Sequence, residues 1–437
     1  MVCTRRKLTL LSAAVALAVV TAAAGSAVQA RTRWARVSGP TKPGVQLGLA
    51  RTADGVLHVI WNRGDRSTSI FETRISPAGS TTGTSTVATG FGGNGGLALL
   101  VMPDRSLRLF AAGAARPGSA AYGINTFTAP ATGRTWTLQS GTYWGGEVAS
   151  ASGAIGATLM KDGRPVTTWR GSAAVGVPPS SQSAYAGGMT DSQLATDAGS
   201  GGVVMSGVTN AGKGGVYMQQ LLPSKGPTTI LPLPFGLNDW NSSASGRIGA
   251  PGVDIAYADG KAIRLARYGG GTKLLARGPF TSAAVCPAPG GRLWVAWGDR
   301  TSGLFATRSN MAATAFEAVQ KLALPKGGSD GLTFVQCEGS AGPADLFANV
   351  SSGATQGFWQ THVLARLSLR ARVAKTKVTI IVVDAGDPLA GIVVRLGGRK
   401  LTTDAHGRAI VTLRPGSYTA RASAGGYAPA SIRFSAG

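Results

Sequence analysis

Two dipeptides in polar loops combine the side chains that bind sugars. Tyr143-Trp144 and Asp239-Trp240 lie in stretches rich in Gly, Ser or Asn, a composition typical of surface loops. Flat aromatic rings stack on the apolar faces of sugars, and a nearby polar group fixes the orientation of the ligand. We therefore take Tyr143, Trp144, Asp239 and Trp240 as candidate ligand-binding residues. Packing into the fold is the alternative for Trp144 and Trp240.

Three other tryptophans end predicted strands. Trp61, Trp169 and Trp297 each close a stretch of alternating apolar residues. A tryptophan on a strand buries a large apolar surface when sheets pack together. We expect these three residues to pack between sheets, with sugar stacking as the alternative.

The acidic residues form no recognisable catalytic pair. Asp54, Asp104, Asp162 and Asp259 stand in Asp-Gly or Pro-Asp sequences, which favour tight turns. Glycoside hydrolysis would need two carboxyl groups held at one site. No Gly-x-Ser-x-Gly sequence supports a serine nucleophile. We therefore predict no catalytic residue and expect binding rather than catalysis, with enzyme activity left open.

Histidines and cysteines are too few for a Cys/His zinc site. The chain has three of each, and one cysteine, Cys3, precedes the apolar N-terminal run. The remaining pair, Cys286 and Cys337, indicates one disulfide if the chain is exported. Two separate buried thiols are the alternative. We predict a Cys286–Cys337 disulfide, no metal site and no cofactor.

The first thirty residues have the order of a secretory signal peptide. Basic residues at 5–7 precede an uncharged run over 8–24, and small residues lead to Ala30. This order predicts cleavage between Ala30 and Arg31. The alternative is an uncleaved membrane anchor, because the run is just long enough to span a bilayer when tilted. We expect a secreted or cell-surface protein that meets the membrane only through its signal segment before cleavage.

The charge balance favours an anionic partner. The full chain carries +24, and without the three basic signal residues 40 Lys and Arg face 19 Asp and Glu, a net +21. Such an excess attracts acidic glycans or cell-wall polymers. The charge is spread along the chain without long basic runs, whereas nucleic-acid binding needs clustered charge with interleaved aromatic residues. We predict a glycan or anionic cell-wall polymer as partner, and no nucleic acid.

A strand, a tight turn and a second strand recur along the body of the chain. The turns carry Asp-Gly, Pro-Asp, Pro-Gly or Gly-Gly, which supply the φ angles of a two-strand reversal. They recur about every 48 residues, the length of a four-stranded propeller blade. The predicted hairpins lie at 47–61, 97–110, 155–169, 194–206, 247–257, 284–297 and 332–348.

These repeats predict an all-β fold with a β-propeller over residues 31–370. We count seven blades, with six as the alternative count and a pair of stacked β-sandwiches as the alternative architecture. One blade cannot bury both of its faces, whereas a ring of blades can. Residues 32–38 are a candidate closing strand for the last blade. Cys286 and Cys337 fall at corresponding places in the last two blades, where a disulfide could join them.

One predicted turn resembles the Asp-box of sialidase-like (BNR-repeat) propellers, Ser-x-Asp-x-Gly-x-Thr-Trp. Gly133, Thr135 and Trp136 match that pattern, whereas Ala129 and Ala131 replace its Ser and Asp. The body of the chain thus resembles a sialidase-type propeller with degenerate motifs.

This resemblance implies a fold more than an activity. Sialidases are similar in using three arginines on the substrate carboxylate, a Tyr nucleophile assisted by Glu, and an Asp acid/base. The four glutamates of this chain lie in no recognisable family motif. Arg170, Arg247 and Arg292 are candidates for gathering around a channel, but arginine is abundant here. A sialidase-like glycoside hydrolase or lyase with an eroded signature is therefore an alternative function.

The C-terminal sixty residues have a different texture. Short alternating strands between turn signals over residues 378–437 predict a small β-sandwich, preceded by a linker at 371–377. The segments Pro388 to Gly391, Thr403 to Gly407 and Leu413 to Tyr418 resemble a carboxypeptidase-regulatory-like module, which has a transthyretin-like fold. That resemblance implies a noncatalytic stalk, adhesion or docking unit.

Together these features predict an exported, non-catalytic protein that binds an extracellular or cell-envelope ligand, either a carbohydrate or another anionic polymer. A sialidase-like hydrolase or lyase is one alternative, and turnover of glycans would favour it. A structural envelope protein is the other, and it predicts no ligand at all.

Overall fold

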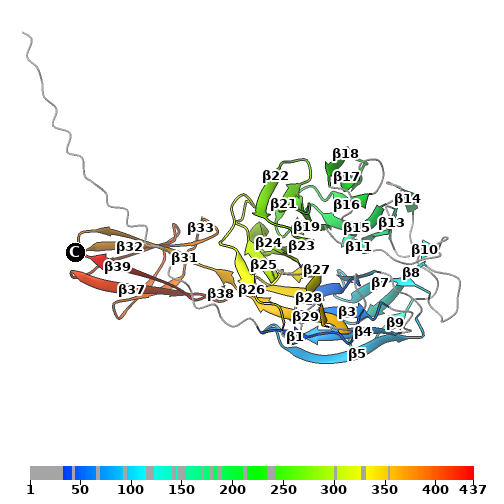
Figure 1. Ribbon diagram of the computed structural model, residues 1–437, viewed down its shortest axis with the longest axis horizontal. Coiled ribbons are helices and arrows are strands. Elements are labelled where there is room, and N and C mark those ends of the chain that lie inside the picture. Colours follow the sequence, from blue (N-terminus) through cyan, green and yellow to red (C-terminus); the bar gives the residue numbers. More distant parts are fainter. Residues whose placement is uncertain are drawn as a thin grey trace, which may run out of the picture.

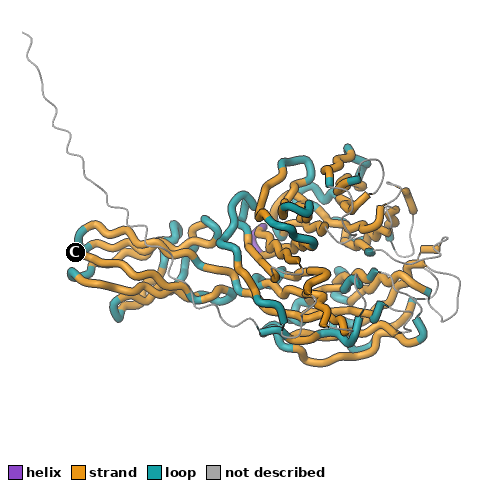
Figure 2. Tube along the Cα trace, viewed as in Figure 1, coloured by secondary structure: helices purple, strands orange, loops and turns teal. Residues whose placement is uncertain are grey.

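The computed structural model describes residues 33–41, 45–64, 69–91, 96–114, 123–139, 144–145, 154–169, 172–176, 181–184, 189–209, 214–233, 242–299, 303–325, 331–352 and 355–437. Their regular structure is β-strand, apart from one 3-10 turn at Pro289–Gly291 (Figure 2). None of these ranges contains a helix long and apolar enough to cross a membrane. The predicted signal peptide and its cleavage site between Ala30 and Arg31 lie outside the described residues.

Seven antiparallel sheets form the described residues from Ala35 to Val363 (Figure 1), and we name each by its first strand in chain order, the last by β27. The β2 sheet holds β2 (Gly48–Arg51), β3 (Leu57–Asn62), β4 (Ser69–Ile75) and β5 (Thr81–Thr89). The β6 sheet holds β6 (Leu97–Val101), β7 (Leu107–Gly113), β8 (Gly123–Ala129), β9 (Thr137–Leu138) and β10 (Trp144–Gly145). The β11 sheet holds β11 (Ile155–Leu159), β12 (Pro165–Trp169), β13 (Ser172–Val175) and β14 (Ser181–Ala184).

The remaining four sheets follow the same plan. The β15 sheet holds β15 (Met189–Thr196), β16 (Val203–Thr209), β17 (Gly215–Leu222) and β18 (Thr228–Pro232). The β19 sheet holds β19 (Ser242–Arg247), β20 (Ala250–Ala258), β21 (Ala262–Arg267) and β22 (Thr272–Arg277). The β23 sheet holds β23 (Ser282–Ala288), β24 (Arg292–Asp299), β25 (Gly303–Arg308) and β26 (Gln320–Leu322). The β27 sheet holds β27 (Gly331–Glu338), β28 (Ala344–Ser352), β29 (Thr355–Val363) and β1 (Ala35–Arg36).

Turn chemistry explains the first hairpin of these sheets. Between β2 and β3, Asp54 accepts a hydrogen bond from Val56 N, and Gly55 has a φ of 83°. An aspartate side chain closes such a turn, and glycine takes the positive φ without strain. The same contact with the N–H two residues on is made by Asp104, Asp162 and Asp259. The predicted turn roles of these aspartates are confirmed.

Each predicted hairpin coincides with the first two strands of one described sheet. The first strands of these sheets surround one central cavity, an arrangement that confirms the prediction of an all-β, propeller-type fold. The N-terminal strand completes the last sheet, because Ala35 pairs with Gln360 and Arg36 with Trp359 of β29. The candidate closing strand at 32–38 therefore has the predicted role.

Apolar clusters fill the spaces between neighbouring sheets. Trp61 packs with Phe358 of the β27 sheet, and Trp169 packs with Phe110 of the β6 sheet. Trp297 belongs to a third cluster that joins the β19 and β23 sheets. All three tryptophans are 5% exposed or less, so packing between sheets is confirmed and their rings are not available to a sugar.

The predicted disulfide is confirmed. Cys286 on β23 and Cys337 on β27 are bonded, with their Cα atoms 5.8 Å apart. The bond joins the innermost strands of the last two sheets in chain order. It therefore links the sheets next to the point where β1 closes the ring.

Residues 368–437, which we call the C-terminal unit, form two further sheets around one apolar core. One sheet holds β31 (Ser368–Ala374), β32 (Lys377–Asp384), β33 (Asp387–Pro388) and β36 (Arg408–Thr412). The other holds β34 (Val393–Leu396), β35 (Arg399–Thr402), β37 (Gly416–Ser423) and β39 (Ala430–Ala436). A short parallel pair, β30 (Ala365–Arg366) with β38 (Tyr427–Ala428), lies where this unit meets the propeller (Figure 1).

The stretch expected as a linker, 371–377, is instead part of this unit. β31 pairs with β32 along its whole length, from Ser368 to Ala374. Leu369, Ala371 and Val373 pack against the core of the unit, while the arginines between them are exposed. This alternation makes an amphipathic strand, so the linker prediction is wrong.

A buried ionic cluster joins the C-terminal unit to the β23 sheet. Asp384 is fully buried, and its Oδ2 lies 3.0 Å from Arg292 Nε and 3.4 Å from Arg308 Nη1. The same oxygen accepts a hydrogen bond from Tyr427 Oη at 2.8 Å. Asp387 adds a contact of 2.8 Å with Arg292 Nη2. Separating the two parts would leave uncompensated buried charges, so this junction fixes how the unit is docked.

Glu317 lies at the same junction. Its Oε2 accepts a hydrogen bond from Arg366 N at 2.7 Å, and its Oε1 accepts one from Gln320 Nε2 at 3.0 Å. Burial raises the pKa of Glu317 to about 7, because desolvation of the charged form outweighs these two hydrogen bonds. The negative charge of Asp384 raises it further.

We expect stability to fall as the pH rises through this range. The pKa of Glu317 is raised from 4.5 to about 7 in the folded protein, so its contribution is fully present below pH 4.5 and lost by about pH 7. The loss amounts to about 3 kcal/mol. Urea unfolding across this range should show that loss in the wild type and in the surface control Asp404→Asn, but not in Glu317→Gln. An equal loss in Glu317→Gln would contradict the assignment.

Candidate functional site

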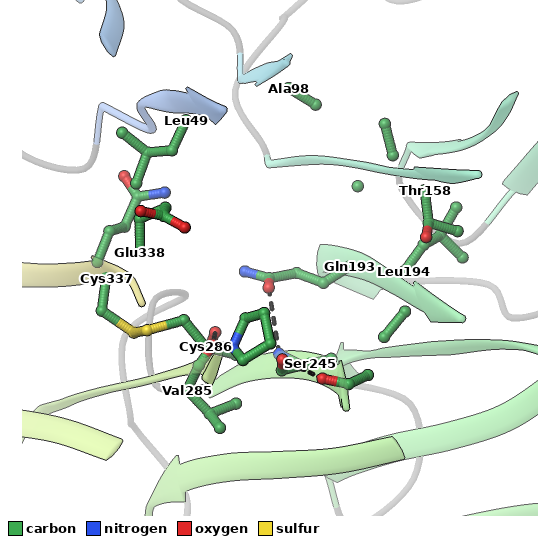
Figure 3. A pocket seen from close by; sticks show the side chains of 18 of the residues that line it. Leu49, Ala98, Thr158, Gln193, Leu194, Ser245, Val285, Cys286, Cys337 and Glu338 are labelled. Atoms are coloured by element: carbon green, nitrogen blue, oxygen red, sulfur yellow. Dashed lines mark hydrogen bonds between the residues drawn. A yellow bond between two sulfur atoms is a disulfide. The ribbon is translucent and has the colours of Figure 1, made fainter. Parts of the chain in front are cut away.

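The first strand of every propeller sheet faces a single central cavity of about 460 Å³. Residues from β2, β6, β11, β15, β19, β23 and β27 line it. Figure 3 shows Gln193 reaching into the cavity from β15, with the Cys286–Cys337 disulfide on the wall. A volume of this size falls in the range of small-molecule sites.

The cavity is lined by buried residues at the end where the inner strands begin. Ile155 and Phe334, near the starts of β11 and β27, are 1% and 3% exposed. Gln46 lies at the same end, before β2, and hydrogen-bonds to two other sheets. At the far end Thr158 is half-buried and Ile248 is 40% exposed. The cavity lining is therefore more exposed beside the hairpin turns than where the inner strands begin.

Gln46 bonds to the open backbone edges of two inner strands. Its Nε2 donates to Ile155 O at 2.9 Å, and its Oε1 accepts from Ile155 N at 2.9 Å and from Leu97 N at 3.2 Å. Backbone groups facing the cavity have no strand partner on that side, and an unpaired buried amide is costly. One glutamine thus satisfies three of them and ties the β2, β6 and β11 sheets together.

Two other glutamines have related roles. Gln336 accepts a hydrogen bond from Leu47 N at 2.8 Å and donates to Leu47 O at 3.2 Å. Gln193 Oε1 accepts from Ala244 N at 3.3 Å. The Gln193 Nε2 group has no acceptor in the part of the chain that the structure describes, and it points into the cavity (Figure 3). It is therefore a hydrogen-bond donor available to a ligand.

The charged groups at the cavity wall bind one another. Glu338 Oε2 lies 2.6 Å from Arg51 Nε, and Glu338 Oε1 accepts from Ser340 N at 2.8 Å. Arg51 also binds Asp345, which is 1% exposed and lies 3.1 Å from His362 Nδ1. These bonds link the β2 sheet to the β27 sheet. They leave amide and hydroxyl groups as the polar groups that face a ligand.

A second, shallower hollow of about 440 Å³ lies on the β6 sheet. Arg108, Thr128 and Thr137 occupy one row across β7, β8 and β9, and all three line the hollow. Arg108 Nε is buried without an acceptor among the described residues. Gln139 donates to Thr128 Oγ1 at 2.8 Å. We call this the β6 hollow and treat it as the alternative site.

The predicted aromatic site residues fall almost entirely outside the described ranges. This holds for Tyr143, Asp239 and Trp240. Trp144 lies in β10, where its backbone pairs with Ile124 of β8. Their predicted role in ligand binding stays a prediction.

Of the three arginines considered as candidates around a channel, the two that the structure describes bind elsewhere. Arg247 lines the cavity, but its guanidinium donates to Gly291 O at 2.8 Å and to Pro251 O at 3.0 Å. Arg292 binds the aspartates of the C-terminal unit instead. Arg170 lies outside the described residues. A cluster of all three arginines around a channel is therefore wrong. The guanidinium of Arg247 binds backbone carbonyls, and that of Arg292 binds the aspartates of the junction.

The Asp-box-like turn has a packing role. Gly133 has a φ of 66°, and a Cβ there would lie 2.7 Å from His58 Nδ1. Trp136 Nε1 donates to Glu72 Oε2 at 3.2 Å, and Glu72 Oε1 lies 2.6 Å from His58 Nδ1. The turn of the β6 sheet therefore covers a buried His–Glu pair of the β2 sheet.

Sequence reasoning did not single out the glutamines of the cavity. Gln46-Leu47 and Gln193-Leu194 repeat the same dipeptide at two inner strands, and Gln336 stands in the last. A lone glutamine among apolar strand residues is a usable signal, because a buried amide needs partners. The turn signals that define the repeats lie at the other end of these strands and do not point to this position.

Comparisons with known proteins agree with the fold. No protein-family model matches the chain, and no curated protein matches it. The BP39L lectin of Burkholderia pseudomallei is 15% identical, covers 80% of this chain and 97% of its own, and has a TM-score of 0.50. The six-bladed, fucose-recognising lectin of Aleuria aurantia is 10% identical, covers 74% of this chain and 93% of its own, and has a TM-score of 0.44. A Dyadobacter fermentans protein of unknown function is 13% identical, covers 76% of this chain and 98% of its own, and has a TM-score of 0.43. The likeness to the Burkholderia lectin shows the β-propeller fold.

Replacing Gln46 should destabilise the propeller more than replacing the half-buried Gln139. Gln46→Ala leaves two amides and one carbonyl of the inner strands without partners, which costs about 3 kcal/mol or more. Gln139→Ala removes one hydrogen bond at the rim of the β6 hollow and should cost about 1 kcal/mol. Chemical unfolding of both variants checks this, and equal losses would refute the bridging role.

Proposed function

We propose that the protein acts outside the cytoplasm and binds a carbohydrate in the central cavity without transforming it. The observation that carries this proposal is the donor group of Gln193 in a central cavity of about 460 Å³. Sugars are recognised by amide and hydroxyl groups that fix their hydroxyls, beside apolar surface that covers their C–H groups. The pocket offers both kinds of surface.

Its lining supports a small, uncharged or weakly charged sugar. Ser243 brings a hydroxyl group to the wall. Thr158 brings another, and Leu49 and Leu194 bring apolar surface (Figure 3). The Burkholderia structure with the same fold is named as a lectin, which supports sugars as the class of ligand. The predicted aromatic residues of the outer loops would extend such a site.

The state of Glu338 supports binding without catalysis. Retaining and inverting glycosidases both need a carboxyl group that donates a proton and a second that attacks or activates water. Glu338 is bonded to Arg51 and to Ser340 N, so both of its oxygens are occupied. A sialidase-like hydrolase or lyase is the second candidate function, and it rests on the Asp-box resemblance alone. The carboxypeptidase-regulatory-like resemblance of the C-terminal unit supports a noncatalytic, docking role for that unit.

The proposed location rests on the N-terminal sequence and on the disulfide. Residues 1–30 have the order of a cleavable signal, and the Cys286–Cys337 bond suits an oxidising compartment. We infer a secreted or cell-surface protein whose partners are glycans or anionic polymers of the envelope.

Gln193→Leu should weaken glycan binding while the protein stays folded. The change removes the donor from the cavity and one hydrogen bond to Ala244 N, so affinity should fall about tenfold or more while stability falls by about 1 kcal/mol. Glycan-array screening followed by calorimetry on the best ligand measures the effect. Gln139→Leu is the matched control, because Gln139 also makes one side-chain hydrogen bond at a hollow.

Three other results would contradict the proposal. Loss of binding in Gln139→Leu alone would place the ligand in the β6 hollow. Release of product from the best ligand at enzymatic rates would favour the hydrolase. Binding to no glycan on the array would favour a structural envelope protein.

A further inference from the structure

The C-terminal unit has a strongly unbalanced charge. Residues 368–437 contain eleven Lys and Arg against three Asp and no Glu. Two of the three acids, Asp384 and Asp387, bind Arg292 of the propeller. The third, Asp404, closes an exposed turn by accepting from His406 N and Arg408 N. No acid of this unit, which is described throughout, forms an ion pair with any of its eleven basic residues.

Four of those basic residues gather on one sheet face. In the β34–β39 sheet, Lys400 stands opposite Arg395, and Arg395 stands opposite Arg421. Arg433 lies on the next strand, opposite Thr419. All four side chains are exposed, and the strands that carry them lie about 4.8 Å apart. We call this surface the basic face.

The arrangement is unfavourable for the isolated protein. Like charges directly opposite one another destabilise a sheet, and here three stand side by side. These exposed side chains contribute nothing to the core, which the alternate residues fill. The cluster is not apparent in the sequence, because its members are separated by up to 38 positions and meet only through strand pairing. An anionic ligand would remove the repulsion.

We propose that the basic face binds an extracellular polysaccharide that carries repeated carboxylate or sulfate groups. Arginine binds such oxyanions through two parallel hydrogen bonds. The hydroxyl groups of Thr402, Thr419, Ser423 and Ser431 share this face and suit sugar hydroxyls. The nearby rings of Tyr418 and Phe434 pack toward the core, so bases of a nucleic acid would find no ring to stack on there.

The outer face of the other sheet provides a matched control. It also exposes three arginines, Arg370, Arg372 and Arg408. Ile381 separates Arg370 from Arg408 in their row, and Ile410 beside them is 52% exposed. The number of arginines is the same on the two faces, but no continuous row of basic residues exists on this one. Comparing variants of the two faces therefore distinguishes a specific binding site from attraction by net positive charge.

The test compares two triple variants of the full chain, Arg395→Thr/Arg421→Thr/Arg433→Thr and Arg370→Thr/Arg372→Thr/Arg408→Thr. Heparin and polygalacturonate are the probes, neutral dextran is the blank, and binding is titrated at about 0.1 M salt, where the Debye length is about 10 Å. The first variant should bind both polyanions about tenfold or more weakly than wild type, with a flatter salt dependence. The second should stay within about threefold of wild type. The first variant should also melt at or above the wild-type temperature, because adjacent like charges are gone.

Several results would overturn the proposal. Equal losses in both variants would mean attraction by net charge alone. A lower melting temperature in the first variant would mean that the row is structural. Tighter binding of the wild type to duplex DNA or to phosphatidylserine vesicles than to either polysaccharide would assign another partner. If the wild type bound neither heparin nor polygalacturonate, the basic face would not be a polysaccharide site.

The inference rests on the proposed function only in placing the protein outside the cytoplasm. Gln193→Leu should keep wild-type binding to heparin, and the basic-face variant should keep the cavity ligand. Failure of one binding activity is therefore distinguishable from failure of the other.

Discussion

The propeller depends on how it satisfies the open edges of its inner strands. In each of the seven described sheets the innermost strand has N–H and C=O groups that face the central cavity and have no strand partner on that side. Unpaired strand edges are costly when buried and invite wrong pairing when exposed. Gln46, Gln193 and Gln336 bind the edges of neighbouring sheets. Ser282 does so through Val335 N at 3.0 Å.

This constraint also shapes the cavity. Side chains that bind neighbouring edges cannot fill the centre, so a space remains that is walled by amides and hydroxyls. Where sheets approach without a bridge, glycine is needed: a Cβ on Gly156 would lie 2.6 Å from Gln193 Cα. Thr158 and Thr196 then share a hydrogen bond of 2.8 Å at the wider end. The cavity thus results from the way the ring closes. Gln193 takes part in both, because its Oε1 binds Ala244 N of the next sheet and its Nε2 group faces the cavity.

Much of the fold could be predicted from the sequence because turns and strand alternation are local signals. Asp54-Gly55 and similar turns predict the hairpins. The isolated pair Cys286 and Cys337, at corresponding places in two repeats, predicts the disulfide. The linker prediction failed because Arg370 and Arg372 made an amphipathic strand look polar. The junction at Asp384 could not be predicted, since Arg292 and Arg308 meet it only through tertiary structure. The basic face was missed for the same reason.

The central claim is that side-chain bridges hold the inner strands as one ring. Hydrogen–deuterium exchange of the amides of Leu47, Leu97, Ile155, Ala244 and Val335 tests it most directly, because each donates to a side chain of another sheet. We predict that all five exchange only through global unfolding, with the protection of the strand-paired amides around them. Exchange of these amides at the rate of exposed turn amides, while the rest of each sheet stays protected, would contradict the account.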